Sequence, residues 1–427
     1  MIKYLPELLK ENIISQDVAD RISGYYQTKN EQNPNRLFIV FGILGAFLVG
    51  LGLILIIAHN WDELSRPVKS GLAFLPLIVG QVLCGYVLMK KNDNISWQEG
   101  TSTFLFFAIG ASISLISQIY NISGNLSTFI LTWMLLSLPL IYIMRSSFTS
   151  LLFISGITYY ACNTGYWTYP YEDAYLYWPL MLLIVPYYIL LTRKKAESNF
   201  VVFHDWIIPL SLIISLGTIA KNHSVLMYIA YFNLLGVFYF IGDAKKIKAT
   251  SQRTSSYYVL GYFGTIILLF FLSFEHFWTN FYLNSPPAVV YLYSREFYAS
   301  LILFVLALVF LVRKSKRTGN QTFNLMDFIF MIIIITFIIG YSGTSFSFIL
   351  INLLILSTGI TILLNGAKTN HLGLLNIGLL IITALVGYRF FDTDLSFLTR
   401  GILFIILGVG FFYSNYWILN KRKVNEK

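Results

Sequence analysis

The chain has 427 residues, of which 56% are hydrophobic and only 12% are charged. A soluble globular domain carries about 25% charged residues, so this composition excludes an ordinary soluble protein or soluble enzyme. The formal net charge is +10, and in a chain this apolar we assign the basic residues to loops that anchor membrane helices, not to nucleic-acid binding. The start of the chain lacks the basic, apolar and small-residue succession of a signal peptide, so we expect none to be removed.

The first 36 residues are more polar than the rest. Leu5, Leu8 and Leu9 suit one face of a short amphipathic helix, and Ser15 can cap a second helix. We therefore expect residues 1–36 to form a small helical hairpin in the cytoplasm.

Continuous apolar runs make up most of the remaining chain. A bilayer core about 30 Å thick needs about 20 helical residues per span, and runs that do not alternate in polarity favour helices over barrel strands. We predict an all-α fold, a polytopic transmembrane helical bundle of about 14 spans, with 12 as the fallback because three runs are short. The predicted spans are 37–58, 70–89, 101–120, 127–144, 149–163, 178–192, 206–220, 225–242, 257–274, 297–312, 328–341, 346–364, 372–388 and 401–418.

The distribution of basic residues predicts the orientation of these spans. With the N-terminus inside, 24 of the 30 Lys and Arg residues fall on the inner side. Cytoplasmic loops hold the excess of Lys and Arg in membrane proteins. We therefore predict that both termini lie in the cytoplasm, where anionic lipid headgroups can attract the basic loops.

A four-helix period is visible in the loops. Predicted spans 2, 6, 10 and 14 each end in a basic cluster, and the clusters begin at Lys90, Arg193, Arg313 and Lys421. Parallel repeats of this kind occur in transporter folds, although any set of apolar hairpins gives some similarity. We predict one transmembrane domain over residues 37–420, with four-helix repeats left open, and a basic cytoplasmic tail over residues 421–427.

Polar residues that could bind a ligand gather at the predicted outer ends of the helices. They come from the first outer loop, from one face of the third span and from the last outer loop. If the bundle brings these ends together, they form an outward-facing vestibule whose arginines could pair with an anionic headgroup. The alternative is that the arginines and the tryptophan only anchor helices at the membrane surface. The candidate binding residues are His59, Asn60, Trp61, Asp62, Ser114, Gln118, Tyr120, Arg389, Asp392 and Arg400.

None of the predicted spans contains Asp, Glu, Lys, Arg or His. Ionisable groups within a membrane usually mark proton relays, ion sites or substrate paths. The sequence therefore argues against a proton-driven carrier with a carboxylate at the midplane, but it allows movement of an amphipathic molecule.

Two predicted outer loops are rich in aromatic residues. We interpret both as part of the aromatic belt at the membrane surface, with stacking on a sugar or an isoprenoid chain as the alternative. The residues are Tyr166, Trp167, Tyr169, Tyr171, Tyr175, Tyr177 and Trp178 in one loop, and Phe277, Trp278, Phe281, Tyr282, Tyr291 and Tyr293 in the other.

No phosphate-binding loop, zinc motif or nucleophile elbow is present. The two cysteines have no metal-ligating neighbours at a useful spacing. We therefore predict no catalytic residue, no metal and no cofactor, and favour a role other than catalysis.

The segment from Leu51 to Leu75 contains Ala58-His-Asn-Trp61 and Lys69 after a glycine-rich apolar run. It resembles a family of predicted prokaryotic membrane proteins known only as domain of unknown function 2157. Residues 9–26, 110–120 and Trp133 also match the pattern, so the resemblance covers about the first 145 residues. It implies a bacterial cytoplasmic membrane and no known activity.

Three functions are compatible with this sequence. The favoured one is a transport-like or lipid-handling membrane protein whose partners are membrane lipids and an amphipathic or lipid-linked substrate. The second is a membrane-embedded transferase or hydrolase at the outer leaflet, with Asp62, Asp392 or His59 as acid or base. The third is an accessory or assembly protein that docks through residues 1–36. The sequence does not identify a protein partner.

Overall fold

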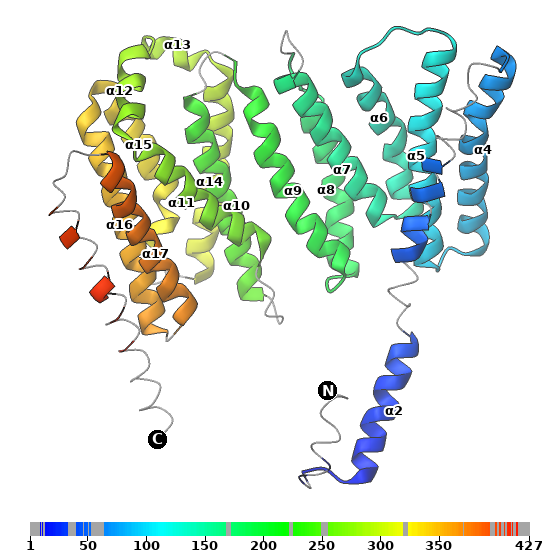
Figure 1. Cartoon of the computed structure of the whole chain (residues 1–427), viewed down its shortest axis with the longest axis horizontal. Coiled ribbons are helices and arrows are strands. Elements are labelled where there is room, and N and C mark those ends of the chain that lie inside the picture. The colour runs from blue at the N-terminus through cyan, green and yellow to red at the C-terminus, as the bar shows by residue number, and fades with distance from the viewer. Residues whose placement is uncertain are drawn as a thin grey trace. The chain divides into compact units, whose positions relative to one another are not determined.

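A computed structural model shows how the apolar runs are arranged (Figure 1). It describes residues 9, 11, 13–32, 40–45, 47–49, 51–52, 64–167, 172–221, 225–248, 255–318, 323–369, 371–392 and single positions or pairs between 398 and 416. All regular secondary structure within this part of the chain is helical. The prediction of an all-α fold is therefore confirmed. The chain divides into two compact units, Met1–His204 and Asp205–Lys427.

The first unit contains α2 (Gln16–Gln32), α4 (Arg66–Lys90), α5 (Ile95–Ile119), α6 (Leu126–Met144), α7 (Ser147–Cys162), the π-helical turn η3 (Asn163–Trp167) and α8 (Tyr177–Lys194). Helix α9 (Asn199–Leu216) begins in this unit and ends in the 3₁₀ turn η4 (Gly217–Ile219) of the second. Helices α4 to α8 pack each against the next, and α7 also contacts α5. The sequential packing reflects the short connections between these helices.

Local sequence explains where several of these helices begin. The side chains of Asn94, Asn125 and Ser146 precede α5, α6 and α7 and accept a hydrogen bond from a backbone N–H of the first turn. Such caps satisfy donors that have no partner within the helix. Pro67 lies in the first turn of α4, as the sequence predicts, because proline lacks the N–H that would be unsatisfied there.

The second unit contains α10 (Leu226–Lys248), α11 (Ser256–Leu272), α12 (Glu275–Asn284), α13 (Ala288–Leu292), α14 (Arg295–Thr318), η6 (Leu325–Asp327), α15 (Ile329–Ser342), α16 (Thr344–Lys368) and α17 (Leu372–Asp392). Helix α10 packs against α11, α14 and α15, and α16 packs against α11, α12, α15 and α17.

Glycine allows two helix pairs of the second unit to approach closely. A Cβ atom on Gly261 of α11 would lie 2.4 Å from the backbone nitrogen of Tyr239 in α10. A Cβ atom on Gly366 of α16 would likewise lie 2.4 Å from the backbone nitrogen of Leu375 in α17. Small residues at such crossings are typical of membrane helices, whose association depends on close packing.

Each of the twelve predicted spans from 70–89 to 372–388 falls on a helix. Seven of the described helices are long and apolar enough to cross a membrane: α4, α5, α6, α9 with η4, α10, α14 and α16. The pair α11 and α12, bent by 72°, would make an eighth. Three shorter apolar helices cover Val40–Val49, α15 and most of α17. The number of 14 spans remains a prediction, since more than half of the last predicted span and the whole tail over 421–427 lie outside the described residues.

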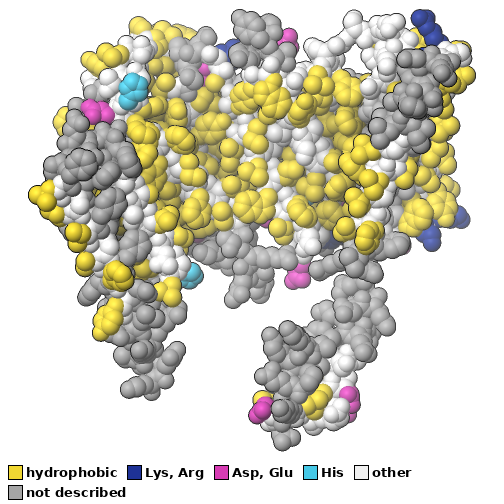
Figure 2. Space-filling view, in the orientation of Figure 1, with side chains coloured by type: hydrophobic (Ala, Val, Ile, Leu, Met, Phe, Trp, Pro, Cys, Tyr) yellow, Lys and Arg dark blue, Asp and Glu magenta, His cyan; other side chains and the backbone are white. Residues whose placement is uncertain are grey.

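The side chains agree with a membrane environment. Hydrophobic side chains cover much of the visible face of the helices, and most of the charged ones in view lie near helix ends (Figure 2). Helix α14 is an example, because only 17% of its apolar segment is buried within the protein. An apolar surface of this kind is stable when lipid covers it.

Candidate functional site

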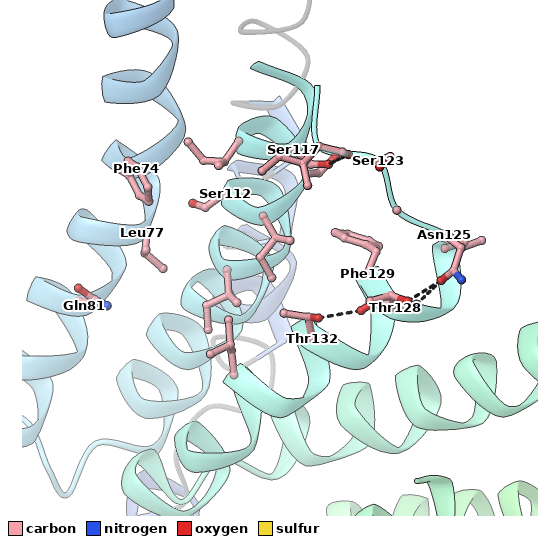
Figure 3. A pocket seen from close by; sticks show the side chains of 18 residues that line it. Phe74, Leu77, Gln81, Ser112, Ser117, Ser123, Asn125, Thr128, Phe129 and Thr132 are labelled. Atoms are coloured by element: carbon pink, nitrogen blue, oxygen red, sulfur yellow. Dashed lines mark hydrogen bonds between the residues drawn. The ribbon is translucent and has the colours of Figure 1, made fainter. Parts of the chain in front are cut away.

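A groove runs between α4 and α6 over α5, within the first unit (Figure 3). We call it the α4–α6 groove. Its volume is about 850 Å³, within the range of ligand-binding pockets. It is lined by Phe74, Leu77 and Gln81 of α4, by Ile109, Ser112, Ile113, Ser114, Ile116 and Ser117 of α5, by residues 122–125, and by Leu126, Thr128, Phe129, Thr132 and Leu136 of α6.

Polar and apolar groups are distributed unevenly along the α4–α6 groove. One end, beside residues 122–125, carries the hydroxyl groups of Ser117 and Ser123 and the amide of Asn125. Away from this end, Leu77 and Leu136 contribute apolar surface, and the amide of Gln81, one turn beyond Leu77, is the polar group on α4. A groove that is polar at one end and largely apolar along its length matches an amphipathic molecule.

Internal hydrogen bonds hold several of the polar groups in place. Asn125 Oδ1 accepts from the backbone N–H and the hydroxyl of Thr128, both at 2.7 Å. The hydroxyl of Ser117 donates to the backbone oxygen of Ile122 at 2.9 Å. These contacts fix the connection between α5 and α6, which forms the polar end of the groove.

The α4–α6 groove contains no ionisable lining residue among those that the structure describes. An anionic headgroup would therefore lack a cation to pair with inside it. Uncharged hydroxyl and amide groups favour a neutral ligand with hydrogen-bonding groups.

Helices α5 and α6 pack closely beside the groove-lining residues Ser114 and Thr132. The indole N–H of Trp133 donates to the backbone oxygen of Phe106 at 2.7 Å. A Cβ atom on Gly110 would lie 2.5 Å from the Trp133 ring. Glycine at position 110 is therefore required by the ring that lies against it, and Ser114, one turn later, is exposed in the groove.

The structure places only some of the candidate binding residues that the sequence suggests. Ser114 lines the groove. Gln118 is exposed nearby on α5, and the hydroxyl of Tyr120 lies 3.1 Å from that of Ser70 on α4. His59, Asn60, Trp61, Asp62 and Arg400 lie outside the described residues, as do the side chains of Arg389 and Asp392 at the end of α17. The predicted vestibule therefore stays a prediction.

The structure also contains buried ionisable groups that the predicted spans exclude. Helices α5 and α9 begin several residues before the predicted spans 101–120 and 206–220, so both contain further residues. Glu99 and His204 lie in these extensions and are 3% and 0% exposed. Both residues lie outside the predicted spans, so the spans themselves remain free of ionisable residues, while the helices that contain them bury two such groups near their ends.

Glu99 binds the beginning of α7. Its Oε1 accepts from the N–H of Ser147 at 2.9 Å, and its Oε2 accepts from the N–H of Phe148 at 3.0 Å and from the hydroxyl of Ser146 at 2.5 Å. The positive end of the α7 dipole stabilises the buried carboxylate. The hydroxyl groups of Ser102 and Thr149 extend this network between α5 and α7.

His204 connects α9 to α7. Its Nε2 lies 3.0 Å from the hydroxyl of Ser150, and its Nδ1 lies 2.7 Å from the backbone oxygen of Phe200. The carbonyl can only accept, so Nδ1 carries a hydrogen and donates it to Phe200, and in the neutral ring Nε2 then accepts from the Ser150 hydroxyl. Ser150 and His204 are both 0% exposed, which makes the pair a structural link between helices.

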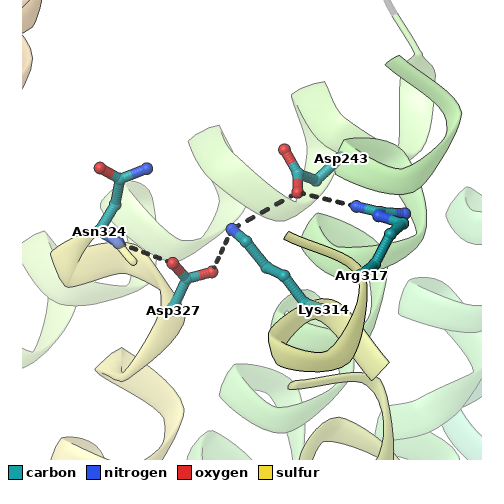
Figure 4. Close-up of polar contacts among 5 residues, drawn as sticks. All are labelled: Asp243, Lys314, Arg317, Asn324 and Asp327. Atoms are coloured by element: carbon teal, nitrogen blue, oxygen red, sulfur yellow. Dashed lines mark hydrogen bonds and ion pairs between the residues drawn. The ribbon is translucent and has the colours of Figure 1, made fainter. Parts of the chain in front are cut away.

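A second buried cluster joins three elements of the second unit (Figure 4). Lys314 Nζ of α14 lies 2.7 Å from Asp327 of η6 and 3.4 Å from Asp243 of α10. Arg317, one turn after Lys314, lies 3.5 Å from Asp243. Asp327 also accepts from the backbone N–H of Asn324 at 2.7 Å and caps η6.

Both buried clusters lie at helix ends that are predicted, from the count of basic residues, to face the cytoplasm. Each ionised group in them has partners among neighbouring helices, as a buried charge requires. Sequence reasoning missed them because they stand outside the most apolar stretch of each helix. One sequence pattern could have indicated part of the second cluster. Asn324 and Asp327 have the three-residue spacing of a capping box, and the structure shows that they form one.

Comparison with known proteins gives a result for the first third of the chain. Residues 6–150 match the model of a family described as Predicted membrane protein (DUF2157). This agrees with the resemblance seen in the sequence. The segment of the chain that matches the family model contains α2, α4, α5 and α6, and therefore the whole α4–α6 groove. No curated protein and no solved structure matches the chain.

Proposed function

We propose that this membrane protein binds an amphipathic molecule in the α4–α6 groove and handles it within the bilayer. The observation that carries this proposal is the shape and chemistry of the groove: about 850 Å³ in volume, polar at the α5–α6 connection and mainly apolar beyond it. The ligand is a neutral lipid-like molecule, because hydroxyl and amide groups line the polar end and no charged side chain does.

The proposal includes a location and an orientation. The protein lies in the bacterial cytoplasmic membrane with both termini in the cytoplasm, as the excess of basic residues on one side supports. The connection between α5 and α6 then belongs to the outer side. A neutral headgroup in the outer leaflet could enter the polar end of the groove while its chain extends along Leu77 and Leu136.

Binding to the groove can be tested with two substitutions on α6. Leu136 lines the groove and Leu135 does not, yet the two are adjacent and are 57% and 48% exposed. Trp at position 136 places a large ring inside the groove, whereas Trp at position 135 places the same ring outside it. Leu136→Trp should therefore weaken binding and Leu135→Trp should leave it unchanged.

The measurement is the affinity of the full chain, in nanodiscs, for a fluorescent monoacylglycerol with a neutral diol headgroup. We expect Leu136→Trp to reduce this affinity at least tenfold, which corresponds to about 1.4 kcal/mol. Thermal unfolding of both variants controls for misfolding. Equal affinities for the two folded variants would overturn the proposal.

Handling of the ligand beyond binding needs a second assay. In liposomes, reconstituted protein should accelerate exchange of the same monoacylglycerol between leaflets, and Leu136→Trp should abolish the acceleration. Binding without any such acceleration would restrict the role to a lipid-binding protein.

A further inference from the structure

A second pocket, formed wholly by the second unit, differs in chemistry from the α4–α6 groove. It lies beside the bend between α11 and α12 and has a volume of about 550 Å³. Its lining is dominated by six aromatic residues from α10, α11, the bend, α12 and α13. They are Tyr228, Phe271, Phe274, Phe277, Phe281 and Tyr291. We call it the aromatic pocket.

The bend that creates the aromatic pocket is held by specific contacts. Trp278 is 0% exposed, and its indole N–H donates to the backbone oxygen of Leu272 at 2.7 Å, across the break. A Cβ atom on Gly340 of α15 would lie 2.6 Å from the Trp278 ring. The amide of Asn352 in α16 donates to the backbone oxygen of Ser273 at 3.3 Å. The pocket is therefore a built feature of the fold.

The polar lining residues are engaged with one another. Asn280 Nδ2 lies 2.8 Å from His276 Nε2, and Asn284 Nδ2 donates to the backbone oxygen of Asn280 at 3.0 Å. The hydroxyl of Tyr291 donates to that of Ser285, which donates to the backbone oxygen of Phe281. These contacts use one N–H of each amide, and the Oδ1 atoms of Asn280 and Asn284 are the acceptors that the two amides offer to a ligand.

The electrostatic character of the aromatic pocket favours a positive ligand. The faces of aromatic rings carry partial negative charge, and no Lys or Arg is among the described lining residues. Glu275, which is exposed, directly precedes the lining residue His276. A metal ion would need several close oxygen ligands, whereas six rings around this volume suit an alkylated ammonium group.

We propose that the aromatic pocket binds an organic cation with an alkylated ammonium group, through its ring faces and amide oxygens. This site is independent of the α4–α6 groove, so either proposal can fail without the other. The cation could be a free solute or the headgroup of a lipid, and the chemistry of recognition is the same.

Choline and its uncharged isostere 3,3-dimethylbutan-1-ol test the proposal. They have nearly the same shape, so a difference in their binding reports recognition of the positive charge of choline. The full chain is placed in nanodiscs of phosphatidylglycerol, which contain no choline, and binding is measured by calorimetry. We expect choline to bind at least tenfold more tightly than the isostere. Equal binding of the two, or binding of neither, would overturn the proposal.

Two matched substitutions on α11 localise the site. Phe271 lines the pocket and Phe263 does not, and they are 60% and 42% exposed, so neither change should prevent folding. Phe271→Leu should weaken choline binding about fivefold because it removes one ring face, and Phe271→Tyr should restore it. Phe263→Leu should have no effect. An equal effect of the two leucine variants would place choline elsewhere and reject the pocket.

Adding phosphatidylcholine to the nanodiscs distinguishes the two sources of the cation. If the lipid headgroup occupies the pocket, free choline will no longer bind. If choline binding is unchanged, the pocket takes a soluble cation that the headgroup does not reach.

Discussion

Replacing Lys314 with methionine should destabilise the second unit far more than the same replacement at Arg317. Lys314 is the cation between Asp327 and Asp243, and the Lys314 and Asp327 side chains are 7% and 0% exposed. Its loss leaves a buried carboxylate without its counter-charge, a change that typically costs about 3–5 kcal/mol. Arg317 is 32% exposed and Asp243 would retain Lys314, so its replacement should cost about 0–1 kcal/mol.

The free energy of unfolding can be measured by denaturant titration of the purified chain in mixed micelles. The double variant Lys314→Met with Asp327→Asn is the sharper comparison. Asparagine at 327 removes the unpaired charge and keeps an oxygen to cap η6, so the double variant should recover at least half of the loss. The reasoning is refuted if Lys314→Met costs no more than Arg317→Met, or if the double variant is less stable than Lys314→Met alone.

Two further substitutions test the first unit. Glu99→Gln should lower the free energy of unfolding by about 1–3 kcal/mol, because an amide offers one acceptor instead of two to the N-terminus of α7; Asp93→Asn, at an exposed position in the preceding loop, should change it by less than about 0.5 kcal/mol. Gly110→Ala should cost about 1–3 kcal/mol because the methyl group overlaps the Trp133 ring, while Gly71→Ala in α4, where nothing lies within 4 Å, should be neutral or slightly stabilising. Denaturant titration measures all four, and a pair with equal costs would show that the named contact contributes nothing.

Much of the helical architecture could be predicted from the sequence. Apolar runs of about 20 residues have few alternatives in a membrane, because the backbone must satisfy its own hydrogen bonds there. Helix α10 (Leu226–Lys248), for example, contains the predicted span 225–242 except for its first residue. Hydropathy set its apolar part, but the helix extends six residues further, to Lys248. Capping and packing determine where a helix ends, and a hydropathy pattern contains no information on either.

The buried ionisable groups could not be predicted because their burial depends on partners far away in the sequence. Glu99 is buried only because residues 146–148 meet it. Lys314 is buried between carboxylates that lie 71 residues before it and 13 residues after it. Patterns in a single sequence describe neighbours along one helix and contain no information on contacts between residues that are far apart in the chain.

The aromatic residues after α11 show a different failure. The sequence suggests a belt at the membrane surface, and Tyr293 is indeed 80% exposed. Trp278 is fully buried and Phe281 is 6% exposed, so the belt interpretation is wrong for both. The reason is the 72° bend, which turns α12 onto α15 and α16, and no proline or glycine at positions 273 and 274 announces it.

Only part of the candidate site could be predicted from the sequence. The polar face of α5 indicated Ser114, which lines the α4–α6 groove. The contribution of Thr128 and Thr132 from α6 could not be seen, because isolated hydroxyl residues in an apolar helix commonly bond to their own backbone. Thr132 does so, with the backbone oxygen of Thr128 at 2.8 Å, and still lines the groove.

The most direct test of the proposed function is to map where a bound amphiphile lies. A monoacylglycerol with a photoreactive diazirine at the end of its chain is added to the protein in nanodiscs, irradiated, and the labelled peptides are identified by mass spectrometry. We predict labelling concentrated on residues 74–81 and 109–136, and its loss with excess unlabelled monoacylglycerol or with Leu136→Trp. Labelling of the lipid-facing surface of α14 to the same extent, unaffected by competition, would contradict the account.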